Sequence, residues 1–159
     1  MGMYTYFTFD GTVKEKYRKD LQDIFSCEYP ETFEEKIISM NPNWTDFANG
    51  ERSDLILSGY QCEDERTYNP ETGELHLECD IKNYCEKNPD GTNRPKNSSK
   101  LFIELLPELF ETDKKIAYSS FYEEDEMAAK YEYIDGEWVC VNEEEYDKAW
   151  NEAHPYGMW

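Results

Sequence analysis

The chain has 159 residues, of which 36 are acidic and 16 basic, and its formal net charge is −20. This charge excludes direct binding to nucleic acid or to an anionic membrane, because either surface would repel it. The length fits one domain around one core, and the 16% aromatic content predicts a folded chain, since disordered acidic chains are poor in aromatic residues.

The N-terminal segment predicts a strand followed by a helix. Residues 4–9 are aromatic and rich in threonine, which favours a strand, and Asp10-Gly11 is expected to end it. Residues 12–15, Thr-Val-Lys-Glu, have the spacing of a capping box, in which the Thr oxygen and the Glu carboxylate each accept from a free backbone N–H. Apolar side chains at helical spacing then predict an amphipathic helix over residues 13–25.

A second helix and a loop are expected next. Residues 32–35, Thr-Phe-Glu-Glu, form another capping box and open a short helix that must end before Pro42. Residues 41–53 contain Pro, Asn and Gly and predict a loop, which Trp44 and Phe47 are expected to hold against the core.

The middle of the chain predicts paired strands at 55–60 and 74–82 with a turn at 69–73. In the second strand apolar and polar residues alternate, so one face is buried and the other is acidic. The buried positions are Leu75, Leu77, Cys79 and Ile81, and the polar ones are Glu74, His76, Glu78 and Asp80. Residues 86–98 contain no apolar residue and predict a mobile loop.

A helix and a hairpin follow. An apolar face at helical spacing marks a helix over residues 101–110, which Pro107 is expected to kink or split. Residues 116–122 and 127–134 predict the two strands of a hairpin around an acidic turn.

The C-terminal segment predicts a turn, a strand and a final helix. Asp135-Gly136 is a tight-turn signal, and residues 138–141 favour a short strand. Asn142 is expected to cap a helix whose first turn is acidic, as the helix dipole favours. Its expected inner face consists of Tyr146, Ala149, Trp150 and Ala153.

The order of these elements, β-α-α-β-β-α-β-β-β-α, predicts the α+β class. One helix between the first strand and a hairpin, and another before the last hairpin, resemble a ferredoxin-like core. We therefore expect an antiparallel sheet with two packed helices, extended by an extra C-terminal strand and helix. A single domain should span residues 1–159, with residues 86–98 as its mobile loop.

No pattern typical of catalysis or metal binding is present. The sequence has only two histidines, and neither a Gly-x-Ser-x-Gly elbow nor a phosphate-binding glycine loop. His76 is expected at the surface beside Glu74 or Glu78, and Cys140 in the core rather than as a nucleophile. Residues 88–93 are similar to a calcium loop but lack the carboxylate at its twelfth position. We predict a protein that is not an enzyme, with no catalytic residue, metal or cofactor.

Cysteine use and hydropathy predict a cytoplasmic protein. The five cysteines are odd in number and scattered, without a C-x-x-C pair, which argues against a disulfide framework and a zinc site. No stretch approaches the roughly 20 apolar residues of a membrane span, and the N-terminus lacks the basic start and apolar run of a signal peptide.

The acidic residues gather toward the C-terminus. Between Tyr122 and Glu152 the chain carries twelve acids and two bases. Acids on one strand face recur about every 6.6 Å, similar to the spacing of phosphates along one nucleic-acid strand. We therefore predict a surface that occupies the groove of a basic, nucleic-acid-binding protein. Its residues are Glu123, Glu124, Asp125, Glu126, Glu132, Asp135, Glu137, Glu143, Glu144, Glu145 and Asp147.

One segment resembles a known family. Residues 117–122, Ala-Tyr-Ser-Ser-Phe-Tyr, lead through an acidic turn into the tyrosine-rich strand 127–134 and a glycine turn before Trp138. This is similar to the last hairpin of a ferredoxin-like domain family of small phage- and plasmid-encoded proteins, although strand 75–79 lacks that family's tryptophans. The size and acidity are also similar to those of phage-borne anti-CRISPR and anti-restriction proteins as a class.

These likenesses imply an acidic, non-enzymatic inhibitor from a phage or mobile element that blocks a nucleic-acid-binding defence protein. One alternative is an immunity protein that neutralises a basic nuclease toxin. Another is a small-molecule-binding or enzymatic domain with an aromatic pocket around Trp44, Tyr118 and Trp138. The acidic surface would otherwise serve solubility alone.

Overall fold

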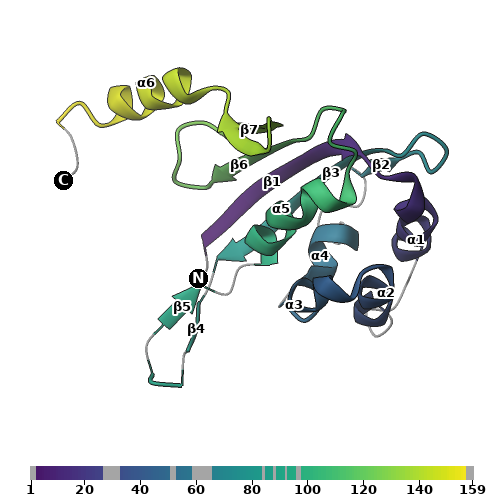
Figure 1. Cartoon of the computed structure of the whole chain (residues 1–159). Helices are drawn as coiled ribbons and strands as arrows, with labels where there is room; N and C mark the ends of the chain where they lie inside the picture. Colours follow the sequence, from purple (N-terminus) through teal and green to yellow (C-terminus); the bar gives the residue numbers. More distant parts are fainter. Residues whose placement is uncertain are drawn as a thin grey trace.

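Six strands form one antiparallel sheet in the order β2-β3-β1-β6-β7-β8. The computed structural model describes residues 3–26, 33–50, 53–58, 66–83, 85–87, 89–91, 93–95 and 98–156. The strands of the sheet are β1 (Met3–Thr12), β2 (Thr67–Tyr68), β3 (Glu74–Asn83), β6 (Ala117–Tyr122), β7 (Ala129–Ile134) and β8 (Glu137–Cys140). The earliest strand, β1, therefore lies inside the sheet, between β3 and β6 (Figure 1).

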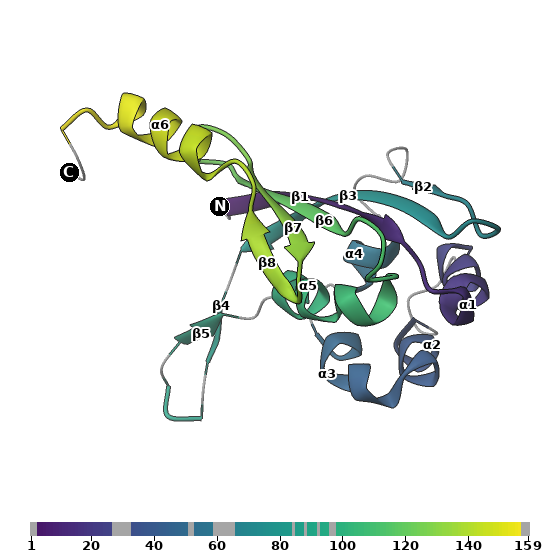
Figure 2. The ribbon, with the colours of Figure 1, turned by 45° about the horizontal axis from the view of Figure 1, so that its top comes forward.

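The helices before β6 pack on one side of this sheet (Figures 1 and 2). They are α1 (Glu15–Phe25), α2 (Phe33–Met40), η2 (Pro42–Trp44), α3 (Thr45–Ala48), α4 (Ser53–Ser58) and α5 (Ser98–Leu109). The last helix, α6 (Glu143–Ala153), instead extends away from the sheet. Across the described parts of the chain, no helix combines the length and the apolar character that crossing a membrane requires.

The core lies between the sheet and the helices. The buried row of β3 is the predicted one: Leu75, Leu77, Cys79 and Ile81. Phe9 of β1 is fully buried, and Phe102 of α5 packs edge-on against it with the ring centroids 4.8 Å apart. Full burial of one such ring stabilises the fold by about 1.5–3 kcal/mol, so this layer decides which face of the sheet turns inward.

The end of β1 passes very close to the end of α5. Phe110 directly follows α5 and is fully buried, and a Cβ atom on Gly11 would lie 2.3 Å from its ring. Backbone bonds close the same junction, since Lys14 N donates to Leu109 O at 2.9 Å and Glu111 N donates to Thr12 O at 2.7 Å. Glycine at position 11 is therefore required by packing.

Two N-terminal predictions are wrong. Asp10-Gly11 does not end the strand, because β1 continues to Thr12, which pairs with Glu74. Since Thr12 belongs to the sheet, residues 12–15 form no capping box; Lys14 is the N-cap and makes no side-chain cap bond. In the second expected box, Thr32 lies outside the described residues, while α2 ends at Met40, before Pro42, as predicted.

The strand expected at residues 55–60 is also wrong, because Ser53–Ser58 form helix α4. Ile56 and Leu57 are adjacent and both buried, which a helix can achieve but an alternating strand cannot. Both places beside β3 are taken by other strands, β1 and β2. Residues 59 and 60 lie outside the described part.

Several turn and packing predictions are confirmed. The turn at 69–73 closes through Gly73 N donating to Asn69 O at 2.7 Å. The turn at Asp135-Gly136 has positive φ at both residues, 52° and 83°. Trp44 and Phe47 are buried, as expected for a segment held against the core, although residues 42–48 form η2 and α3 and not the predicted loop. The split expected at Pro107 does not occur, because α5 runs as one helix from Ser98 to Leu109.

The α+β class and the antiparallel sheet are confirmed, with β8 and α6 as the extra C-terminal elements. The ferredoxin-like core is not confirmed. Every strand pairing in the sheet is antiparallel. More helices pack on the sheet than the two predicted. The stretch 86–98, expected as a loop, contributes to a separate pair of strands, β4 (Cys85–Lys87) and β5 (Asn93–Pro95).

Candidate functional site

The candidate site is the face of the sheet opposite the packed helices, which we call the open face (Figure 2). Strand alternation directs every second side chain of each strand toward it. Among the side chains that the structure describes, the register places these on it: Tyr4, Tyr6, Thr8 and Asp10 of β1; Glu74, His76, Glu78 and Asp80 of β3; Ala117, Ser119 and Phe121 of β6; Lys130, Glu132 and Ile134 of β7; and Glu137 and Val139 of β8. Val141, just beyond β8, continues the last row.

The open face is acidic. Its described side chains include six carboxylates, one lysine and one histidine. The carboxylates come from four strands, so they form a spread of charge and not one row: Asp10, Glu74, Glu78, Asp80, Glu132 and Glu137. A surface of this kind attracts cationic partners over distances of about one Debye length, roughly 8 Å at physiological salt.

The open face also carries exposed apolar side chains. Among the described residues, the large hydrophobic side chains that stay exposed are Tyr4, Ile134, Val139, Val141 and Tyr156. The first four belong to the open face, with exposed fractions of 38%, 44%, 40% and 47%. Exposed apolar side chains that gather on one face, beside polar ones, are typical of protein-binding surfaces.

His76 lies between two carboxylates of the open face. Its Nδ1 is 2.5 Å from Asp10 Oδ1, and its Nε2 is 3.4 Å from Glu78 Oε1. Burial alone would lower the pKa of His76, but the hydrogen bonds and charges of Asp10 and Glu78 outweigh it and raise the pKa above the ordinary 6.5. The predicted partner Glu78 is confirmed, while Asp10, which β1 brings alongside, takes the place of Glu74.

We expect His76 to make stability depend on pH. Because its folded-state pKa is raised, its contribution is complete below the unfolded pKa near 6.5 and is lost as the pH rises through the folded pKa. The difference in free energy of unfolding between wild type and His76→Gln should therefore shrink over that window, as measured by urea unfolding at several pH values. His154→Gln is the control, since His154 stacks on Trp150 at the far end of α6. A difference that is constant with pH would contradict this assignment.

Among the described residues, depressions border the open face at both ends of β1. One, with a volume of about 550 Å³, is lined by Tyr4, Tyr6, Asp80, Phe121 and Glu123. The other, of about 490 Å³, lies at the opposite end of β1, and its lining includes Asp10, His76, Tyr68 and Lys115. Both combine apolar wall with carboxylates.

The predicted partner-binding residues fall in several places. Glu123, Glu124, Asp125 and Glu126 form the turn between β6 and β7, and Glu143, Glu144, Glu145 and Asp147 lie on α6. These two groups are neighbours, because the Tyr146 side chain hydrogen-bonds Asp125. Burial, together with the charge of Asp125, raises the pKa of Tyr146, so its hydroxyl stays protonated and able to donate.

Asp135 and Glu137 lie apart from that turn. They follow β7, whose six residues separate them from the β6–β7 turn by about 20 Å. Glu132 lies between the two ends, on the open face, with its Oε1 4.0 Å from Lys115 Nζ. The predicted set is therefore not one contiguous patch, and only Glu132 and Glu137 belong to the open face.

The start of α6 is fixed differently from the prediction. Asn142 is the N-cap residue but makes no side-chain cap bond. Its Oδ1 accepts from Lys130 N at 2.9 Å, and its Nδ2 donates to Ala128 O at 2.8 Å, which ties α6 to β7. No residue of α6 is buried, so the predicted inner face is at most half-buried, and Ala153 is exposed.

Sequence reasoning missed four acidic members of the open face: Asp10, Glu74, Glu78 and Asp80. The alternation in residues 74–81 showed that three of them share one face. What it could not show is that β3 pairs with β1, which in turn pairs with β6. That pairing joins the acids of β3 to those of the C-terminal hairpin.

The aromatic pocket proposed around Trp44, Tyr118 and Trp138 divides into two groups. Trp44 packs on Tyr17 and donates its Nε1–H to Glu108 at 2.7 Å. Tyr118 and Trp138 contact each other with ring centroids 4.8 Å apart. Neither of the two depressions is lined by any of the three residues.

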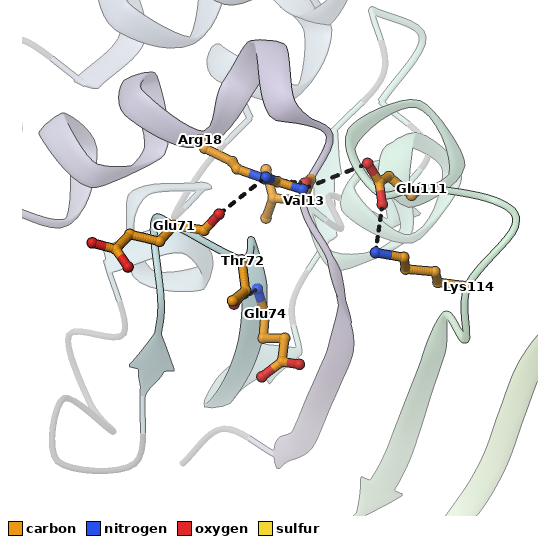
Figure 3. A network of polar contacts seen from close by, with 7 residues as sticks. All are labelled: Val13, Arg18, Glu71, Thr72, Glu74, Glu111 and Lys114. Carbon is orange, nitrogen blue, oxygen red and sulfur yellow. Dashed lines mark hydrogen bonds and ion pairs between the residues drawn. The ribbon is translucent and has the colours of Figure 1, made fainter.

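A polar network centred on Arg18 supports one end of the sheet (Figure 3). Arg18 Nε donates to Val13 O at 2.9 Å and Nη1 donates to Glu71 O at 3.2 Å. Nη2 lies 3.5 Å from Glu111, which also pairs with Lys114 at 3.2 Å. One guanidinium thus joins α1, the β2–β3 turn and the segment after α5.

Replacing Arg18 by lysine should lower the free energy of unfolding by about 1–3 kcal/mol, because a single ammonium cannot reach both carbonyls and the carboxylate. Urea unfolding measures the change. Lys19→Arg, at an exposed position on α1, is the control and should be nearly neutral. Equal stability of Arg18→Lys and wild type would show that the network contributes nothing measurable.

The described residues contain no group of three or more His, Cys, Asp or Glu side chains placed to hold a metal ion. Comparison of the chain with protein-family models, with curated proteins and with solved structures gives no significant match.

Proposed function

We propose that this protein binds a basic protein surface through its open face. The observation that carries the proposal is that six carboxylates and four exposed apolar side chains occur together on the open face. Charge steers a cationic partner to the face, and apolar contact then holds it. A purely solvated coat would need only the charge, so the apolar side chains favour binding over solubility.

The kind of partner follows from the array of acids. Glu78 and Asp80 are two residues apart on β3, so their side chains lie on the same face of the sheet. The distance between two such positions is close to that between successive phosphates of a nucleic-acid strand. We propose a non-enzymatic inhibitor of a nucleic-acid-binding defence protein, of the anti-CRISPR or anti-restriction type, acting in a bacterial cytoplasm. The resemblance of residues 117–138 to small phage- and plasmid-encoded proteins supports an origin in a mobile element.

Photo-crosslinking tests this function. A photoreactive amino acid at Ser119, on the open face, should capture a partner in bacterial cells, whereas one at Asp46, on α3, should not. The captured protein should bind nucleic acid and release it when this protein is added. Capture of a nuclease toxin would favour the immunity protein instead. Capture through Asp46 alone, or of a protein without affinity for nucleic acid, would contradict the proposal.

A further inference from the structure

The depression beside β1 is built by one row of side chains across three strands. Tyr6 pairs in register with Asp80 of β3 on one side and with Phe121 of β6 on the other. Directly opposed side chains in such a row lie about 4.5–5.5 Å apart. Tyr4 precedes Tyr6 on the same face, and Glu123 follows β6 with its N–H donating to Tyr4 O at 3.1 Å. The backbone pairing of β1 with β3 and β6 therefore determines which residues line the depression.

This lining joins ring faces with carboxylates. Tyr4 is exposed, and Tyr6 and Phe121 are half-buried, so their rings form an apolar wall that solvent can reach. Asp80 stands at one side of the wall and Glu123 at the other. Burial raises the pKa of Asp80. A cation that entered here would meet a carboxylate on each side of the wall.

We propose that the depression receives an arginine side chain of the partner protein; this rests on the proposed function and names its contact point. The guanidinium is planar and weakly hydrated, so one face can stack on the rings of Tyr6 and Phe121 while its N–H groups donate to Asp80 or Glu123. A lysine ammonium is a compact, strongly hydrated charge and gains less from the same wall. The depression thus distinguishes arginine from lysine, which the rest of the acidic face does not.

Two short peptides provide the probe, one of alternating arginine and serine and one of alternating lysine and serine. The full-length wild-type protein should bind the arginine peptide about 5- to 30-fold more tightly at one fixed ionic strength, by isothermal titration calorimetry. Ring resonances of Tyr4, Tyr6 and Phe121 should shift on its addition. Phe121→Ala should abolish the preference for arginine, and Asp80→Asn should weaken it, because Glu123 remains as an acceptor.

Matched controls separate this contact from general charge attraction. Val139→Ala trims another apolar side chain of the same face, and Asp147→Asn removes one exposed charge from α6; both should retain the preference. Equal affinity of wild type for the two peptides, or a preference that survives both Phe121→Ala and Asp80→Asn, would overturn the proposal. If both peptides bind equally but neutralising the open face abolishes binding, the arginine contact fails and the proposed function stands. If neither peptide binds, both fail.

Discussion

A variant carrying Glu78→Gln, Asp80→Asn, Glu132→Gln and Glu137→Gln should bind the captured partner about 10- to 1000-fold more weakly than wild type, while remaining folded. These four carboxylates lie on three strands of the open face, and none is fully buried. Most of the loss should be in the association rate, because these charges steer the partner toward the face. That rate should also become less sensitive to salt, because fewer charges remain for salt to screen. Surface plasmon resonance at low and at physiological ionic strength measures both.

The control removes the same number of charges from α6, by Glu143→Gln, Glu144→Gln, Glu145→Gln and Asp147→Asn. These side chains are exposed and lie off the sheet, so binding should change only a few-fold. A larger loss in the α6 variant would place the partner on the C-terminal helix, where sequence reasoning put much of it. An association rate that neither variant nor salt alters would mean that apolar contact alone drives binding.

Replacing Gly11 by alanine should lower the free energy of unfolding by about 1–3 kcal/mol, the usual cost of overpacking a filled core. The added methyl would lie 2.3 Å from the ring of Phe110, which is fully buried and so has little room to move. Urea unfolding, followed by circular dichroism, gives the change. Thr8→Ala, in the same strand but facing the open side, should cost less.

A double-mutant cycle identifies the cause. In a Phe110→Leu background, Gly11→Ala should cost less than in wild type, because the smaller side chain leaves space for the methyl group. The coupling between the two positions is expected at about 0.5–3 kcal/mol. If the cost of Gly11→Ala were the same in both backgrounds, backbone entropy and not the ring contact would explain the need for glycine.

Local patterns predicted the elements well where they rest on neighbours in the chain. The alternation of apolar and polar residues at 74–81 predicted both the buried row and the acidic row of β3. Asp135-Gly136 predicted a turn, and both residues have positive φ. The hairpin of β6 and β7 followed from the same kind of signal. In each case the residues that decide the structure lie within a few positions of one another.

The remaining errors come from contacts between distant residues. Residues 55–60 have the composition of a strand, but β1 and β2 occupy both sides of β3, and residues 55–58 belong to helix α4. Asp10-Gly11 has the composition of a turn, but pairing with residues 75 and 76 extends the strand through it. The open face could be predicted only in part for the same reason. Its acidic residues lie on one face only because β1 pairs with both β3 and β6.

The position of β1 has a consequence for the order of folding. It is the earliest strand in the chain, yet its partners come late: the register pairs Met3 with Asn83 and Thr5 with Tyr122. Both ladders therefore close long loops, a topology of high contact order that slows folding. During synthesis, β1 leaves the ribosome with neither neighbour made, and its edge that pairs with β6 stays unpaired until β6 has emerged. A ribosome-bound chain that stops before residue 117 should thus expose the β6-facing edge of β1, the step at which this protein most needs a chaperone.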